Sequence, residues 1–470
     1  MSSSKKSASA PFITLVVVFF FWGFVAASND ILIPVFKSAL NLSQLESQMI
    51  SFAFYVAYTV GSLMYFIISK IKGSDILNSL GYRNGLALGL SISAAGTLLF
   101  IPAANTASFP LLISGLFIVG LGFSLQQTAA NPLAISMGDP SKGSQRLSLA
   151  GGINNVGTTI GPVIVSFAIF GSASSGNTTM DLKSVQIPYL VLGAAFLLAA
   201  VLFKLSSVPD KIESVFDASK DDGKTSPLQY PQLYLGMIAI FLYVGVEVST
   251  ASNLPEFMKQ TLGMENHSVA PYISLFWASL MIGRWTSAAG AFDISTKAKN
   301  ALNLILPFIA FGIFLLVNFI GGSDISVFYM YIAMVAVLIV VDKLCGGKPA
   351  KQLLIYSFCA IAALLTGIFS TGMTSVYAFV SVGLFCSTLW PCIFTLAITG
   401  LGKHTNEGSS FLIMMIMGGG LVSMAQGYLA DNVLGIQQSY WVGIICFSYL
   451  AFYAWKTRHL DAATTAGAGH

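Results

Sequence analysis

Two carboxylates interrupt apolar stretches of this sequence, and each is a candidate for cation chemistry. Asp30 follows Asn29 within "FFFWGFVAASNDILIPVF" (residues 19–36), and Glu247 lies within the apolar run at 232–258. A carboxylate at bilayer depth costs roughly 3 kcal/mol or more, and no Lys or Arg lies at the same predicted depth. We therefore expect Asp30 and Glu247 to bind a proton or a metal cation. The alternative is a protonated carboxyl that only joins helices by hydrogen bonds.

Amides and aromatic rings on the predicted spans form a second candidate group. Amides both donate and accept hydrogen bonds, which suits an uncharged ligand rich in hydroxyls. Rings stack on the apolar face of a pyranose, so the combination predicts a sugar pocket. The predicted substrate-binding residues are Asn29, Gln126, Gln127, Asn131, Asn154, Asn155, Asn253, Trp22, Tyr58, Trp277 and Trp390. For any one of them the alternative is bonding between helices or, for Trp, a place at the membrane interface.

Enzyme chemistry has little support in the sequence. The histidines fall in predicted loops or tails, at His267, His404, His459 and His470, without a metal-ligand or nucleophile motif. No phosphate loop of the GxxxxGK[ST] kind occurs, which argues against an ATP-driven pump. We expect no enzyme activity, no cofactor and no nucleic-acid partner, which leaves a carrier driven by an ion gradient.

The elements that must position these residues are membrane spans. Of the 470 residues, 55% are hydrophobic and only 9% are charged, whereas soluble domains carry about 25% charged residues. The sequence therefore predicts an all-α polytopic membrane protein. The fourteen predicted spans are 12–36, 49–69, 84–104, 109–137, 147–170, 187–205, 232–258, 269–292, 300–320, 325–342, 352–370, 374–400, 409–430 and 438–456.

The placement of basic residues predicts the orientation of these spans. With the N-terminus in the cytoplasm, only Lys37, Lys183 and Lys259 of the 23 Lys and Arg residues fall on the outer side. This asymmetry follows the positive-inside rule. We therefore expect both termini in the cytoplasm.

A polar segment divides the chain into two halves. Residues 206–231 carry charges and prolines and predict a cytoplasmic linker between a bundle at 1–205 and a second at 232–470. The segment "AFYVAYTVGS" (53–62) aligns without gaps to "LFWASLMIGR" (275–284), which places Gly61 opposite Gly283. Such matches at equivalent places favour a parallel internal repeat.

Several motifs resemble the fucose–proton symporter family of the major facilitator superfamily, which includes bacterial glucose/galactose transporters. They are "NDILIPVF", "QTAANPL", "SLAGGINNVGTTIGP", "PCIFTLAITGLG" and "GSSFLIMMIMGGGLVSMAQGYLAD". The resemblance covers nearly all spans. It implies two six-helix bundles around a central sugar site that is reached alternately from the two sides. It also implies that Asp30 matches the first-span aspartate associated with proton coupling in the family.

This sequence departs from the family pattern in two places. Gln127 stands where the fucose symporter pattern has a glutamate, so Glu247 becomes the candidate substitute and Na⁺ an alternative to H⁺. A Na⁺ site near Asp30 would use oxygens of Asn29, Ser28 and Gln127. Residues 300–342 read as an inserted transmembrane hairpin outside the transport core, giving fourteen spans in all; the alternative is lipid-facing bulk.

Arg284, in "MIGRW", matches the family's "IGRF" at the predicted cytoplasmic end of its span. It is either a gating residue or an ordinary anchor whose charge reaches the membrane surface.

These observations lead to one hypothesis with two alternatives. The chain is predicted to import a neutral monosaccharide, a hexose or deoxyhexose, together with H⁺ or Na⁺, as a monomer in a bacterial inner membrane. The alternatives are an exporter or carrier of another small neutral solute, and a membrane sensor that binds sugar without moving it.

Overall fold

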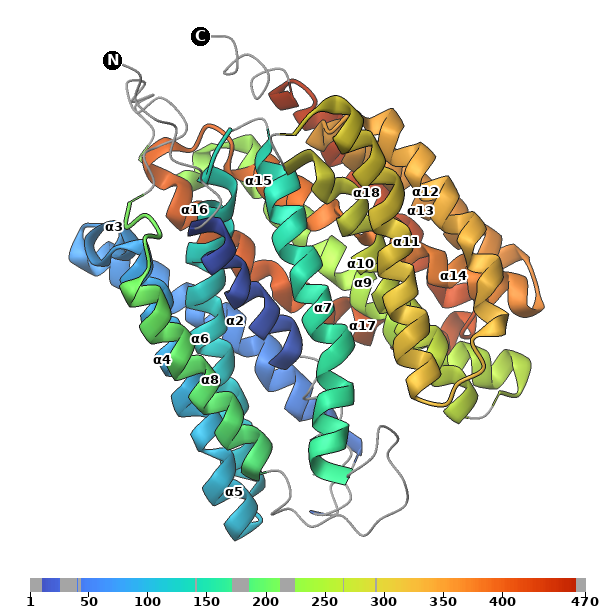
Figure 1. The fold of residues 1–470 in the computed structure, drawn as a ribbon, viewed down its shortest axis with the longest axis horizontal. Helices are drawn as coiled ribbons and strands as arrows, with labels where there is room; N and C mark the ends of the chain where they lie inside the picture. The colour runs from blue at the N-terminus through green and yellow to red at the C-terminus, as the bar shows by residue number, and fades with distance from the viewer. Residues whose placement is uncertain are drawn as a thin grey trace. The chain divides into compact units, whose positions relative to one another are not determined.

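A computed structural model describes residues 11–25, 40, 44–139, 142–170, 186–211, 225–264, 266–291 and 294–461 (Figure 1). This described part of the chain is helical and contains no β-strand. Helices satisfy every backbone hydrogen bond within one segment, which is what the interior of a bilayer requires. The all-α prediction is confirmed.

The first half of the chain contains a helix at Pro11–Val25 and seven further helices. They are α2 (Gln44–Lys72), α3 (Ile76–Leu80), α4 (Tyr82–Leu98), α5 (Phe100–Thr106), α6 (Phe109–Ser136), α7 (Gly143–Phe170) and α8 (Gln186–Leu205). Two of these helices have a polar N-cap residue. At the start of α6 the Ser108 side chain accepts a hydrogen bond from the backbone N–H of Leu111. At the start of α3 the Asp75 side chain accepts one from the backbone N–H of Asn78.

The second half continues as helices separated by short turns. Its α-helices are α9 (Pro231–Leu262), α10 (Asn266–Ala288), α11 (Thr296–Ile320), α12 (Ile332–Cys345), α13 (Pro349–Phe369), α14 (Gly372–Cys386), α15 (Leu389–Ile398), α16 (Thr405–Met414), α17 (Gly418–Leu429) and α18 (Trp441–Thr457). Short 3₁₀ segments are η3 (Pro227–Gln229), η4 (Ala289–Ala291), η5 (Ser326–Tyr331), η6 (Gly402–His404), η7 (Met415–Met417) and η9 (Gln438–Tyr440), and a π-helical turn covers Ala430–Leu434.

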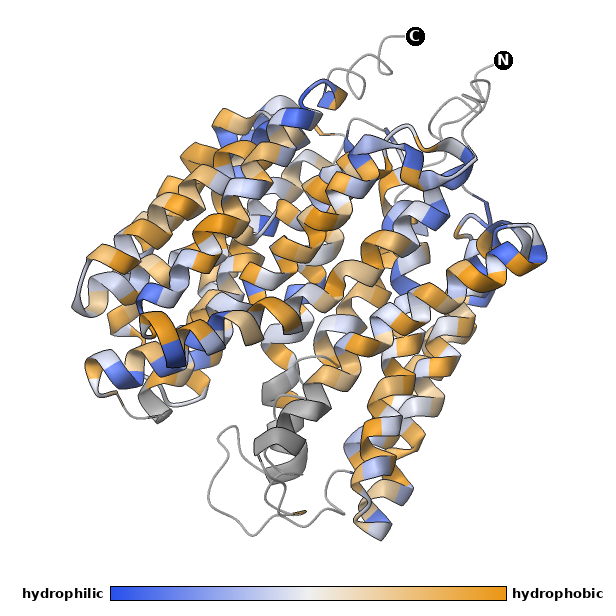
Figure 2. Ribbon diagram, turned by 180° about the vertical axis from the view of Figure 1, so that it is seen from behind, coloured by the Kyte–Doolittle hydropathy of each residue, from blue (hydrophilic) through white to orange (hydrophobic). Residues whose placement is uncertain are grey.

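Within the described residues, ten helical segments are long and apolar enough to cross a membrane. Apolar residues follow the helices along their whole length (Figure 2). One face of α8 exposes the apolar residues Leu197, Leu198, Val201 and Leu202. An exposed apolar face of this kind is suited to contact with lipid. Each of the fourteen predicted spans contains helix in its described part, and the chain is an integral membrane protein.

The chain divides into two compact units. Unit 1 comprises Met1–Gly138, Val156–Pro227 and Leu401–Met414, and unit 2 comprises Asp139–Asn155, Leu228–Gly400 and Met415–His470. Helix α7 therefore contributes its first turns to unit 2 and the rest to unit 1, and α16 groups with unit 1.

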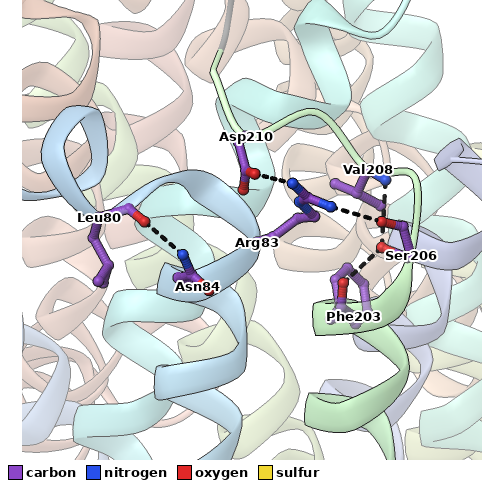
Figure 3. Close-up of polar contacts among 7 residues, drawn as sticks. All are labelled: Leu80, Arg83, Asn84, Phe203, Ser206, Val208 and Asp210. Atoms are coloured by element: carbon purple, nitrogen blue, oxygen red, sulfur yellow. Dashed lines mark hydrogen bonds and ion pairs between the residues drawn. The ribbon is translucent and has the colours of Figure 1, made fainter.

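Unit 1 is built around α4, which packs between α6 and α8 (Figure 1). The start of α4 is tied to the segment that follows α8. There Arg83 pairs with Asp210 and also donates to the Ser206 carbonyl at 3.0 Å (Figure 3). Asp210 lies outside the spans, and its pKa is lowered from the ordinary value chiefly by the hydrogen bond from Arg83.

Unit 2 repeats this arrangement with one addition. Here α13 packs against α14 and α18, as α4 packs against α6 and α8. Helices α11 and α12 come between α10 and α13 in the chain, and α11 packs on α10. Helix α12 packs on α13 and also contacts α10 and α14. That the inserted helix pair lies outside the transport core stays a prediction.

Two helix crossings confirm the internal repeat in atomic detail. A Cβ added to Gly61 of α2 would lie 2.8 Å from the Ser124 side chain of α6, and one added to Gly283 of α10 would collide with Ser387 after α14. One turn before each serine, at Gly120 and Gly383, an added Cβ would in turn approach a backbone carbonyl of α2 or α10. In both units a glycine thus lets the second span of a bundle approach the fourth.

Candidate functional site

In unit 2, Glu247 lies in the middle of α9. Tyr243 lies one helical turn earlier and donates its hydroxyl hydrogen to the Glu247 carboxylate. Spacing of four residues places both side chains on one face of the helix. Tyr243 is buried, whereas Glu247 is partly exposed.

Arg284 of α10 binds a carbonyl at a break between two helices. Its Nε donates to the Ser387 carbonyl at 2.9 Å, in the short gap that separates α14 from α15. In an uninterrupted helix this carbonyl would accept from residue 391, but Pro391 has no N–H. The helix break therefore supplies an acceptor, and a cation at the end of α14 is favoured by the helix dipole.

The same guanidinium also holds the first turns of α7. Arg284 Nη1 donates to Asn155 Oδ1 at 2.7 Å and to the Gly151 carbonyl at 3.2 Å. Asn155 in turn donates to the Trp277 carbonyl at 3.5 Å. One arginine thus joins α7, α10 and the α14–α15 break within unit 2.

The charges of Arg284 and Glu247 act on one another. The guanidinium is close enough to interact electrostatically with Glu247 and with the Tyr243 hydroxyl. The expectation that no Lys or Arg lies near Glu247 in depth is wrong, because α10 brings Arg284 alongside α9. Charge compensation of this kind lowers the cost of keeping a carboxylate inside the membrane.

Aromatic rings accompany this cluster in unit 2. The Trp390 and Tyr243 ring centroids lie 6.4 Å apart, and Trp277 meets Phe276 edge to face at 5.5 Å. Trp277 and Trp390 are both partly exposed. Their open ring surface is available for stacking on a ligand.

In unit 1, the adjacent residues Gln126 and Gln127 have different surroundings. Gln126 is fully buried; its Oε1 accepts from Trp22 Nε1 at 2.8 Å and its Nε2 donates to Ser93 at 3.0 Å. Gln127 is partly exposed and donates to the Tyr58 hydroxyl at 2.9 Å. Gln126 therefore acts as the alternative interpretation expects, as an amide that joins neighbouring helices by hydrogen bonds. Gln127 retains open surface.

Three further asparagines differ in their exposure and in the hydrogen bonds that their side-chain amides make. Asn131 is 1% exposed, and its Nδ2 has no hydrogen-bond partner among the described residues. A buried amide without a partner costs about 1–3 kcal/mol, so it is a candidate to donate to a ligand. Asn253 donates to the Ser249 carbonyl of its own helix at 2.8 Å. Asn154 is partly exposed.

Asn29, Asp30 and the predicted oxygens of Ser28 lie outside the described residues, so the proposed cation site near Asp30 remains a prediction. In the described part of the chain, no group of three or more His, Cys, Asp or Glu residues could hold a metal ion.

Sequence reasoning missed Tyr243 and the Ser387 carbonyl. Two signals in the sequence point to them. Tyr243 precedes Glu247 by four residues, and Pro391 frees the carbonyl four residues before it. Neither signal predicts that Arg284 reaches this place.

Comparison with known proteins identifies the family. Residues 12–342 match the model of the Major Facilitator Superfamily. The chain belongs to the major facilitator superfamily. It is 32% identical to the glucose/galactose transporter of Brucella abortus, over 96% of this chain and 95% of that protein. It is also 28% identical to the L-fucose-proton symporter of Escherichia coli K12, over 96% and 94% of the two chains.

A solved structure extends this agreement to the fold. The major facilitator transporter FucP, crystallised in the outward conformation, matches with a TM-score of 0.73 at 26% identity, over 96% of this chain and 99% of that one. The resemblance found in the sequence motifs is therefore confirmed. The protein is a major facilitator transporter in the family of these sugar transporters and is not an enzyme.

Proposed function

We propose that this protein imports a neutral hexose or deoxyhexose in symport with H⁺. The observation that carries the proposal is similarity along nearly the whole chain to transporters named for glucose and galactose and for fucose and protons. The site chemistry supports a neutral, hydroxyl-rich ligand. In unit 1, Gln127 has a partly exposed amide, and in unit 2, Trp277 and Trp390 have partly exposed rings. The one cation of the described cluster in unit 2, Arg284, already has acceptors in the protein.

In the proposed mechanism, Asp30 takes up the proton from outside. Neutralising a carboxylate lowers the cost of closing an apolar cavity over it, so closure becomes favourable when proton and sugar are both bound. Glu247 has a charged neighbour, Arg284. We assign Asp30 the main coupling role and Glu247 a second one, in which a change in its charge alters its interaction with Arg284.

The test is counterflow and gradient-driven uptake in proteoliposomes with a panel of sugars, with and without Na⁺, at two pH values. We expect uptake of a hexose or deoxyhexose that an inward proton gradient drives and that Na⁺ does not change. Uptake that requires Na⁺ at constant pH would replace proton coupling with a sodium site, and failure of every sugar would overturn the substrate class.

The variant Asp30→Asn separates coupling from binding. Asp30→Asn should keep sugar exchange but lose accumulation against a gradient. Full accumulation by that variant would exclude Asp30 as the coupling residue. Loss of exchange as well would assign Asp30 to sugar binding.

A further inference from the structure

The loop that ends the inserted helix pair contacts the first turn of α7. Helix α12 ends at Cys345, and the next two residues, Gly346 and Gly347, have φ values of 64° and 69°. The Gly347 carbonyl accepts a hydrogen bond from Gln145 Nε2 at 2.9 Å. Gln145 lies in the first turn of α7 and is only 9% exposed.

Two glycines make room for the Gln145 side chain. A Cβ on Gly347 would lie 2.6 Å from Gln145 Nε2, and a Cβ on Gly290, after α10, would lie 2.8 Å from Gln145 Cγ. Any side chain at either position must displace Gln145. The loop and the end of α10 therefore form a closely fitting socket for this residue.

A series of side-chain hydrogen bonds also links the inserted pair to the same turn of α7. Asp342 of α12 accepts from Gln352 Nε2 of α13 at 3.0 Å, which leaves Gln352 Oε1 to accept from the Cys392 thiol at 3.6 Å. The Cys392 sulfur in turn contacts the Ser144 hydroxyl at 3.7 Å. Tyr356 also donates to Asp342, at 3.2 Å. The carboxylate thus fixes which way the Gln352 amide points.

Contacts that hold the first turns of α7 can affect conformational change, because α7 is shared between the two units. Its residues up to Asn155 group with unit 2, whereas those from Val156 on group with unit 1. In an alternating-access transporter, a helix shared between two units is expected to change its contacts with one of them during the cycle. Release of its first turns requires Gln145 to leave its socket and Arg284 to release Asn155.

We propose that the inserted helix pair is a brace for α7. Its Gly346–Gly347 loop and Asp342 hold the first turns of α7 on unit 2 and so stabilise the conformation in which α7 is docked there. The inserted pair thereby influences the conformational equilibrium of the transporter. The inference concerns the helices alone and does not depend on which sugar or cation is carried.

Hydrogen–deuterium exchange of the purified full-length protein tests the brace with matched glycine variants. Gly347→Ala and Gly346→Ala place the same side chain at similar positive φ values, but only the first collides with Gln145, since nothing lies within 4 Å of a Cβ at Gly346. Losing one buried hydrogen bond is worth about fivefold in the opening equilibrium. We expect peptides from 143–155 to exchange about fivefold faster in Gly347→Ala than in Gly346→Ala.

Gln145→Glu provides the second variant, because it keeps the shape of the side chain but removes the donor to Gly347 without backbone strain. We expect the same region to exchange faster in this variant, with peptides of α4 and α8 unchanged. Equal exchange of 143–155 in the two glycine variants, together with wild-type exchange in Gln145→Glu, would overturn the proposal. If Gly347→Ala does not fold, the result of Gln145→Glu decides alone.

Discussion

At the scale of single residues, neighbouring amides in α6 have different partners. Successive positions in a helix are about 100° apart, so two adjacent side chains point in different directions. Gln126 faces the helix Pro11–Val25 and α4, where Trp22 and Ser93 use both ends of its amide. Gln127 faces Tyr58 and keeps open surface. We infer that the first amide holds the bundle together and that the second, which keeps open surface, serves a ligand.

This difference predicts that two matched substitutions affect different properties, one the stability of the protein and the other its transport activity. Gln126→Leu leaves the buried Trp22 N–H without its acceptor, so it should destabilise the protein by about 1–3 kcal/mol. Gln127→Leu removes a bond at a partly exposed site and should lower sugar counterflow with little loss of stability. Thermal unfolding of purified protein and counterflow in proteoliposomes measure the two effects. Equal losses of stability in both variants would contradict the assignment.

At the scale of elements, the close crossing of α10 and α14 determines the position of Arg284. Gly283 lets α10 approach α14, and the next residue, Arg284, then reaches the carbonyl that Pro391 leaves free. In unit 1 the equivalent position is Ser62, which bonds to Ser124 at 2.9 Å. The two units therefore share one crossing geometry, but only unit 2 carries a charge there.

A pair of glycine variants tests this crossing. Gly283→Ala would collide with Ser387 and should destabilise the protein by about 1–3 kcal/mol through overpacking. It should also reduce transport, because Arg284 would be displaced from the helix break. Gly312→Ala in α11 has nothing within 4 Å of the added Cβ and is the control, with no loss expected. Thermal unfolding and uptake of both variants would be compared, and a stable, active Gly283→Ala would contradict the close-packing argument.

At the scale of the whole molecule, the segment after α8 is anchored electrostatically. Arg83 lowers the pKa of the Asp210 carboxyl outside the spans. A lowered folded-state pKa means that the carboxylate stabilises the folded protein above the ordinary Asp pKa of about 4 and that this contribution is lost as the pH falls through the lowered value. Both side chains are more than one third exposed, so the effect is small.

The pH dependence of unfolding measures this contribution. Asp210→Asn should lower the midpoint of thermal unfolding at pH 7 by less than about 2 °C. The difference from the wild type should shrink on acidification toward pH 3. The double variant Arg83→Gln/Asp210→Asn should be no less stable than either single variant. A difference that grows at low pH would show that the carboxylate is not held in its charged form by Arg83.

The sequence alone determined the class of protein, the positions of its spans and the existence of the inserted pair. Apolar runs long enough to cross a bilayer depend only on composition and length, and the glycine matches between 53–62 and 275–284 locate the repeat. The domain limits 1–205 and 232–470, like the roles of the site residues, stay proposals.

Tertiary structure decided which polar groups meet. Arg284 and Glu247 come from different helices, and no local pattern fixes how one helix is rotated against another. The same holds for Gln145 and Gly347, which are far apart in the chain and meet through packing of α7. The side-chain sizes and close crossings of the assembled bundle set these rotations, so the partners of buried polar groups are a property of the fold and not of any one segment.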